Sequence, residues 1–295
     1  MREDSKAGLA GAIASLLAGE RMQGVLIEEY SSALGEWQIL AIGISGFVEP
    51  STFEVYLRVA QQFSFVDMVC KAATRETLFL GPEEVGSANA DGGLDLAVHY
   101  MQAAWDFTDA RWRHVGALGQ TTYVKYHRGY RIRRALQEDW VREPDVYLAA
   151  GYTPLHQIHV EAPETRHAKA GGSPRRIVYF ADAVEVAKRA PGSSMSYVMR
   201  YEDPVCGFSP NEQRILCKAV EGMTDDQIAK DVGVSSNTVK MSWRRIYERV
   251  RKARPVVLSE PAGADHAGVR GLEKRRRVIA FVEDHPEEMR RYTPI

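Results

Sequence analysis

This sequence has few cysteines, no long uncharged run and almost no net charge. Its three cysteines, Cys70, Cys206 and Cys217, are too few and too scattered for a disulfide scaffold or a cysteine-rich zinc site. The uncharged runs at residues 7–19 and 37–48 hold 13 and 12 residues, and the longest run, residues 146–160 with its two histidines, holds 15. A membrane-spanning helix needs about 20. The first residues lack the basic region and the cleavage site of a secretory signal. We therefore expect a cytoplasmic protein that has no membrane partner.

Sequence motifs for nucleotide binding and for catalysis are also missing. No Gly-x-x-x-x-Gly-Lys-(Ser/Thr) loop is present, which argues against an ATP-dependent regulator. The apolar run at residues 37–45 is not followed by the paired acids that a phospho-receiver domain needs. No Ser/His/Asp or Cys/His arrangement can be recognised in the sequence. We expect no enzymatic activity and no cofactor.

Proline and glycine mark a boundary near residue 204, where the character of the chain changes. Before it, apolar spacing and capping signals predict helices at residues 9–17, 51–62, 94–107 and 131–140. Runs of β-branched and aromatic residues predict strands at residues 37–45, 120–127, 155–161, 176–181 and 196–201. Small and loop-forming residues predict loops at residues 81–93, 162–174 and 255–271.

These elements predict three parts of the chain. Residues 1–203 are expected to form an α+β sensory or dimerisation domain, for which a PAS-like and a GAF-like fold are two alternatives. Residues 204–254 are expected to form an all-α helix-turn-helix domain. Residues 255–295 are expected to form a loop and a C-terminal helical extension, with its helix at residues 272–284.

Aromatic and basic residues alternate around residues 107–140. The aromatic ones are Trp105, Trp112, Tyr123, Tyr126, Tyr130 and Trp140, and the basic ones are Arg111, Arg113, Lys125, Arg128, Arg131, Arg133 and Arg134. Such a pattern fits a pocket for an anionic ligand, a second nucleic-acid surface, or a half-buried core rimmed by solvated arginines. We favour the core, because charged side chains around apolar ones are most often solvated.

Three histidines have a spacing that a zinc or haem site could use. His156 and His159 are three residues apart, and His167 follows eight residues later. In a strand, however, the first two would point to opposite faces, and no acidic or cysteine ligand lies at a regular offset. We therefore expect ordinary histidines and no metal site.

After residue 204, three short helices have clear start signals. The first opens with a capping box from Ser209 to Glu212, and the second with a box from Thr224 to Gln227. The third helix, expected over residues 236–252, follows a glycine turn. Two helices joined by such a turn have the outline of a helix-turn-helix unit.

The third helix has two contrasting faces. Val239, Trp243, Ile246 and Val250 form one apolar stripe that must pack on the two preceding helices. The opposite face carries Asn237, Lys240, Met241, Arg244, Arg245 and Arg251. An exposed basic helix of this width fits the major groove of DNA, where Lys and Arg read guanine edges.

The near-zero net charge hides two parts of opposite sign. Residues 204–295 hold 17 Lys and Arg against 13 Asp and Glu, whereas residues 1–203 hold 21 against 26. Within the basic part, residues 240–254 alone hold seven basic residues and one acidic residue. The basic run at residues 274–277 is less specific, and either contacts phosphates or is ordinary helix charge.

Residues 208–250 resemble the LuxR/NarL-type DNA-binding module of bacterial transcription regulators. They read FSPNEQRILCKAVEGMTDDQIAKDVGVSSNTVKMSWRRIYERV. The opening FSPNE, the core EGMTDDQIAKDVGVS, and the recognition-helix residues NTVK and RRIY match the pattern of that family. The resemblance covers only this segment of the 295 residues.

The resemblance implies a role for each matching residue. Lys240, Met241 and Arg244 would contact base edges, and Asn237, Thr238 and Arg245 would lie at the phosphates. Arg251, which follows the matching segment directly on the same helix face, is also expected at the phosphates. Three departures from the family pattern are Arg214 in place of an acid, the pair Ser242–Trp243, and a missing short fourth helix after Val250. The last departure puts the usual fourth-helix dimer contact in question.

Together these observations predict a sequence-specific DNA-binding transcription regulator. It would bind double-stranded DNA as a homodimer, because one helix reads only a few base pairs. A small-molecule effector would act on the N-terminal domain. An alternative is an enzymatic or metal-dependent N-terminal module with a DNA-localising tail. In a third hypothesis, the trihelical unit has a sigma-factor-like role and contacts RNA polymerase.

Overall fold

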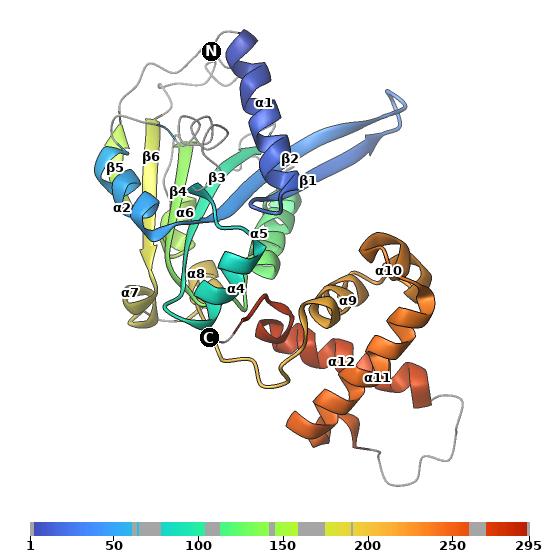
Figure 1. Ribbon diagram of the computed structural model, residues 1–295. Coiled ribbons are helices and arrows are strands. Elements are labelled where there is room, and N and C mark those ends of the chain that lie inside the picture. Colours follow the sequence, from blue (N-terminus) through green and yellow to red (C-terminus); the bar gives the residue numbers. More distant parts are fainter. Residues whose placement is uncertain are drawn as a thin grey trace. The chain divides into compact units, whose positions relative to one another are not determined.

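The computed structural model describes most of the chain (Figure 1). The described residues are 3–60, 64, 78–103, 113–141, 145–158, 175–189, 191–259 and 270–293. Contacts between Cα atoms divide the chain into two compact units. The first unit comprises Met1–Arg200 with Thr293–Ile295, and the second comprises Tyr201–Tyr292.

The first unit is built on a mixed six-stranded sheet, as far as the structure describes it. Its strands are β1 (Gln23–Ser31), β2 (Glu36–Val48), β3 (Leu94–Ala103), β4 (Ile132–Val141), β5 (Thr153–Ile158) and β6 (Arg175–Asp182). They lie in the order β1-β2-β3-β4-β6-β5. The pair β3–β4 is parallel, and the other neighbouring pairs are antiparallel.

Helices cover both faces of this sheet. They are α1 (Glu3–Ala18), α2 (Pro50–Val59), α4 (Pro82–Ala90), α5 (Arg113–His127), α6 (Asp145–Ala149), α7 (Ala183–Ala187) and α8 (Ser194–Val198). Successive strand residues point to opposite faces, so Leu96 and Tyr179 belong to one core and Ala97 and Val178 to another. The first core includes side chains of α4, α6, α7 and α8, and the second includes side chains of α1 and α2. The predicted α+β class is therefore confirmed.

Two predicted helices are strands in the structure. Residues 94–103 form β3 and residues 132–141 form β4, while residues 104–107 lie outside the described part. Helices on both sides of the sheet bury both faces of β3, so its apolar residues do not alternate cleanly with polar ones. Even the side chain of Asp95 is fully buried. Its Oδ2 atom lies 2.7 Å from a guanidinium nitrogen of Arg133 and 2.8 Å from one of Arg134, and these charges neutralise the carboxylate. Without the alternation, local sequence gives a misleading helical pattern.

Two predicted strands are helical. Residues 120–127 lie in α5, and most of residues 196–201 lie in or directly after α8. In α5, Gly119, Tyr123 and His127 recur every four residues and line one surface together with β1 and β2. Packing against the sheet thus outweighs the strand preference of the aromatic and β-branched residues in this segment.

Smaller corrections concern element boundaries. The predicted loop at residues 81–93 contains α4, which begins at a proline. Helix α2 is capped at Glu49 rather than Ser51 and ends at Val59 rather than residue 62. The sequence did not predict β1. The helix at residues 9–17 and the strands at 37–45, 155–158 and 176–181 are confirmed, and the predicted loop at 162–174 lies outside the described residues.

The second unit is all-α where the structure describes it. Its helices are α9 (Pro210–Val220), α10 (Asp225–Val232), α11 (Ser236–Ala253) and α12 (Arg270–Asp284), with 3-10 turns η4 (Pro255–Leu258) and η5 (Pro286–Met289). Both predicted capping boxes form, at Ser209–Glu212 and at Thr224–Gln227. The turn between α10 and α11 has Gly233 in the left-handed region, with a φ of 74°, which glycine adopts without steric cost.

Helix α12 shares one hydrophobic core with the other three helices. Val278 and Val282 are fully buried and belong to the same cluster as Leu216 of α9 and Ile246 of α11. The chain therefore does supply a fourth helix to this unit, after η4 and the undescribed residues 260–269. None of the helices described anywhere in the chain has the length and apolarity that crossing a membrane requires.

Candidate nucleic-acid interface

One buried stripe sets the orientation of α11. Val239, Ile246 and Val250 are fully buried, and Trp243 is 5% exposed. All four belong to the core that α9, α10 and α12 also build. The rotation of α11 about its axis is thereby fixed, which decides the side chains that remain outside.

The seven side chains predicted to contact DNA all occupy exposed positions of α11. They are Asn237, Thr238, Lys240, Met241, Arg244, Arg245 and Arg251. Residues three or four apart are neighbours on a helix surface, and the guanidinium of Arg244 lies 3.6 Å from the sulfur of Met241. The structure thus brings the predicted base-contacting side chains onto one surface.

Hydroxyl groups fix the start of α11 relative to α10. The side chain of Ser235 caps the helix by accepting a hydrogen bond from the backbone N–H of Thr238 at 3.1 Å. The hydroxyls of these two residues are also 2.8 Å apart. Ser236 donates to the carboxylate of Asp226 at 2.7 Å. These hydrogen bonds attach the first turn of α11 to the first turn of α10.

A buried carboxylate holds two arginines of α11 in place. Glu212 is 2% exposed, and its oxygens lie 3.7 Å from Nε of Arg245 and 3.2 Å from Nε of Arg249. Arg249 also donates to the carbonyl of Gly207 at 2.7 Å. Because a buried carboxylate needs partners, both guanidinium groups have a structural role. This role of the two arginines could not be predicted from the sequence, because Glu212 lies on a different helix.

The aromatic pair on α11 contacts α12. Arg275 donates to the carboxylate of Asp225 at 2.7 Å, and its guanidinium lies over the ring of Trp243, 4.9 Å from the centroid. The indole N–H of Trp243 donates to the same carboxylate at 3.2 Å, and Tyr247 stacks on the indole. Two departures from the family pattern, Trp243 and the later position of the fourth helix, are thus linked. Trp243 provides the surface to which this fourth helix, α12, binds.

The basic run at residues 274–277 is largely engaged within the protein. Besides the contacts of Arg275, both Arg276 and Arg277 pair with Glu273 at 2.9 Å. These two guanidinium groups lower the pKa of Glu273 to about 2. Arg277 also donates to the carbonyl of Ser259 at 2.6 Å. Three of the four basic side chains therefore have partners in their own unit.

The other candidate ligand residues are scattered. His156 lies in β5, whereas His159 and His167 lie outside the described residues. Within the described part, the acidic and histidine side chains that come close enough to hold a metal ion are Glu202, His285 and Glu287, with donor atoms within 4.8 Å of one another. The sequence did not single out this group.

The aromatic and basic stretch of the first unit resolves mainly into core and ion pairs. Tyr130 is 7% exposed, and Tyr123 packs against the same core. Arg133 and Arg134 are bound to Asp95, while Trp105, Arg111 and Trp112 lie outside the described residues. The favoured interpretation thus agrees with the structure for the core, but Arg133 and Arg134 are paired with a buried carboxylate and do not form the solvated rim that it predicted.

Comparison with known families identifies the segment that contains this interface. Residues 207–255 match the family model GerE, described as bacterial regulatory proteins of the luxR family. The matching segment supports DNA-binding transcription regulation, and the resemblance predicted from the sequence is confirmed. No curated protein matches the chain.

Proposed function

We propose that this protein is a sequence-specific regulator of transcription that places α11 in the major groove of DNA. The observation that carries the proposal is the fixed orientation of this helix. Its apolar stripe is buried in a four-helix core, so its basic face remains exposed. The match of residues 207–255 to a family of bacterial regulators supports the same function.

The exposed side chains divide into two groups in this proposal. Lys240 and Arg244 donate hydrogen bonds to guanine edges, and the apolar end of Met241 contacts a thymine methyl group. Asn237, Thr238, Arg245 and Arg251 lie at the phosphates, where they set the register of the helix on the duplex. The contact of Arg245 with Glu212 holds its guanidinium at the edge of the helix.

The protein acts as a homodimer on an inverted or direct repeat, because a single helix reads too few base pairs for a specific site. The first unit, in this proposal, controls the second by binding a ligand or by dimerising. RNA polymerase is then the partner through which the bound protein changes transcription.

A binding titration with variants tests the assignment of α11. A preferred duplex is first selected from a random pool with the full-length protein, and affinity is then measured by fluorescence anisotropy. We expect Lys240→Ala and Arg244→Ala each to weaken binding to that duplex by about 1–3 kcal/mol.

The matched control is Arg276→Ala, which removes an exposed arginine from α12 and should leave the affinity unchanged within about twofold. Binding of both α11 variants at wild-type affinity would overturn the assignment of the recognition helix.

A further inference from the structure

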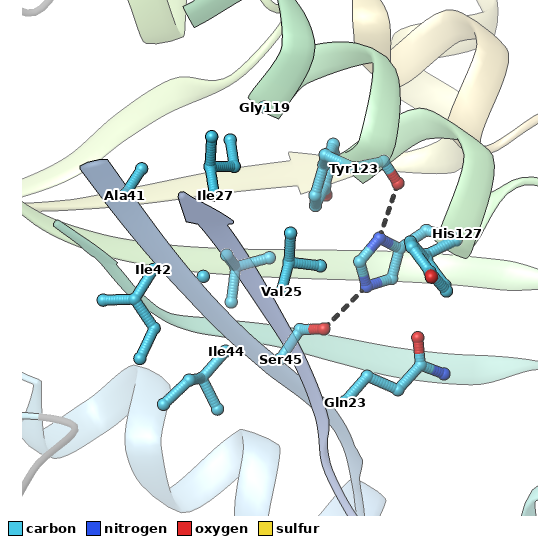
Figure 2. A pocket seen from close by; sticks show the side chains of 13 residues that line it. Gln23, Val25, Ile27, Ala41, Ile42, Ile44, Ser45, Gly119, Tyr123 and His127 are labelled. Carbon is cyan, nitrogen blue, oxygen red and sulfur yellow. Dashed lines mark hydrogen bonds between the residues drawn. The ribbon is translucent and has the colours of Figure 1, made fainter. Parts of the chain in front are cut away.

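A recess lies between α5 and the strands β1 and β2 of the first unit (Figure 2). Its volume is about 60 Å³, and it opens partly to solvent. Aliphatic side chains form most of its wall, among them Val25, Ile27, Ala41 and Val98. It is therefore a small apolar site with few polar groups, and a ligand larger than this space would extend through its opening.

A hydrogen-bonded pair, Ser45 and His127, forms one polar part of the recess. Ser45 Oγ and His127 Nε2 are 2.8 Å apart, and His127 Nδ1 is 2.8 Å from the carbonyl oxygen of Tyr123 (Figure 2). Both Ser45 and His127 are buried. Because a carbonyl only accepts, Nδ1 carries the proton in the neutral ring, and Nε2 accepts the proton of the serine hydroxyl. The lone pairs of Ser45 Oγ are then left to accept a hydrogen bond.

The second polar group is Gln23 on β1. Its Oε1 is buried and has no hydrogen-bond partner within the described residues, although buried polar atoms in proteins are nearly always paired. Gln23 lines the same recess as Ser45 and His127. Gln23 Oε1 is thus an acceptor without a donor, and the Ser45 hydroxyl cannot supply one because it donates its proton to His127. A ligand that donates a hydrogen bond would satisfy this end of the recess.

We propose that this recess binds a small neutral molecule that has an apolar body and a hydroxyl or amide N–H group. The N–H or O–H of the ligand donates to Gln23 Oε1, and its apolar part packs against Val25, Ile27 and Val98. The described wall contains no Asp, Glu, Lys or Arg side chain, so nothing in it would compensate a full charge.

Glycine at position 119 leaves room for a side chain in this recess. Gly43 and Gly119 both line the recess, and a Cβ added to Gly119 would meet only Ile27 Cδ1, at 3.7 Å. A larger side chain at this position of α5 would therefore project into the recess without a backbone clash. Gly119→Leu is accordingly a variant that fills the site while leaving its polar groups unchanged.

Nuclear magnetic resonance of the full-length protein with labelled methyl groups tests the site. The probes are cyclopentanol, which donates and accepts hydrogen bonds, and cyclopentanone, which has a similar shape and only accepts. We expect cyclopentanol to cause saturable shifts of the Ile27 and Val25 methyl signals. Cyclopentanone should bind about three- to tenfold more weakly, because it leaves the acceptors unpaired.

The variants separate this site from general apolar binding. Gln23→Leu should reduce the affinity for cyclopentanol to that for cyclopentanone, and Gly119→Leu should abolish the binding of both, in proteins whose other methyl signals are unchanged. The control Gln38→Leu alters an exposed glutamine of β2 and should bind like wild type. Equal affinity for the two probes, or no saturable shift at Ile27, would overturn the proposal.

The role of this recess as an effector site rests on the proposed function, whereas the binding of a ligand to it does not. The methyl titration contains no DNA and the anisotropy titration contains no ligand, so each proposal can fail while the other holds.

Discussion

At the scale of single residues, two buried carboxylates each connect separate segments of the second unit. Glu212 accepts the N–H that opens α9 and lies beside Arg245 and Arg249 of α11. Glu288, which is 2% exposed, accepts backbone hydrogen bonds from residues 205–206 at 2.9 and 3.1 Å. Each carboxylate therefore binds two parts of the chain that are distant in sequence.

Replacing Glu212 should destabilise the unit that carries α11. We expect Glu212→Ala to lower the free energy of unfolding by about 1–2 kcal/mol, because the capping box and both arginine contacts are lost. Glu212→Gln keeps an acceptor for the N–H of Ser209 and should lose less. Urea unfolding followed by circular dichroism measures the change. The control Glu248→Ala, an exposed acid of α11, should stay within about 0.5 kcal/mol of wild type, and a loss as large as that of Glu212→Ala would contradict the account.

Glu288 should give the stability a particular dependence on pH. Its burial raises its pKa above the ordinary value of 4.5, while its two backbone hydrogen bonds oppose the shift. The folded state thus holds this proton more tightly than the unfolded state, so the contribution to stability is present below pH 4.5 and is lost as the pH rises. The stability of wild type relative to Glu288→Gln should therefore fall as the pH rises above 4.5. Unfolding titrations of both proteins across this range measure it, with Glu283→Gln on the exposed side of α12 as the control. A difference that is constant or rises with pH would refute the assignment.

At the scale of elements, the attachment of α12 completes the helix-turn-helix unit. Arg275 joins α12 to Asp225 at the start of α10 and to Trp243 on α11. It also donates to the carbonyl of Met223 at 3.0 Å. One side chain therefore connects three segments around the indole, in addition to the apolar contacts of Val278 and its neighbours.

Arg275→Met should loosen this attachment while keeping most of the aliphatic packing. We expect a loss of about 1–3 kcal/mol in unfolding free energy, because the carboxylate of Asp225 and the carbonyl of Met223 lose a charged donor. Hydrogen exchange measures where the loss occurs, and protection should fall in α12 and at the start of α10. Arg276→Met, one residue further on an exposed side of the same helix, is the control. Similar protection in both variants would show that this contact does not hold α12.

The capped helices of the second unit could be predicted because their signals are local. Ser209 and Glu212, like Thr224 and Gln227, act within four residues of sequence. Elements of the first unit depend on distant partners instead, and Asp95 is a clear case. No local pattern reveals that its carboxylate will meet two arginines of β4, so β3 and β4 were predicted as helices.

The candidate sites show the same contrast. The seven exposed residues of α11 follow from its periodicity and from the family resemblance. The pair Ser45 and His127 could not be predicted, since 82 residues separate the two positions and only the folded sheet brings them together. The same holds for Arg275 and Trp243, whose helices are joined by a long connection.

For the whole molecule, the distribution of charge supports a DNA-binding role better than the net charge of −1 suggests. Residues 204–295 carry the basic excess, and the acidic excess lies in residues 1–203. Several basic side chains of the second unit are paired internally, including those of Arg275, Arg276 and Arg277. The basic residues on the exposed face of α11 are therefore the ones best placed to replace counterions on a phosphate backbone.

The most direct measurement of the central claim, that α11 reads DNA sequence, is in vitro selection of bound duplexes with full-length wild-type protein and with Arg244→Ala. For wild type, the account predicts an enriched motif with two half-sites whose centres are about one helical turn apart. For Arg244→Ala, it predicts the same spacing with a relaxed base preference at one position of each half-site. No enriched motif with wild type, or an identical motif with both proteins, would contradict the claim.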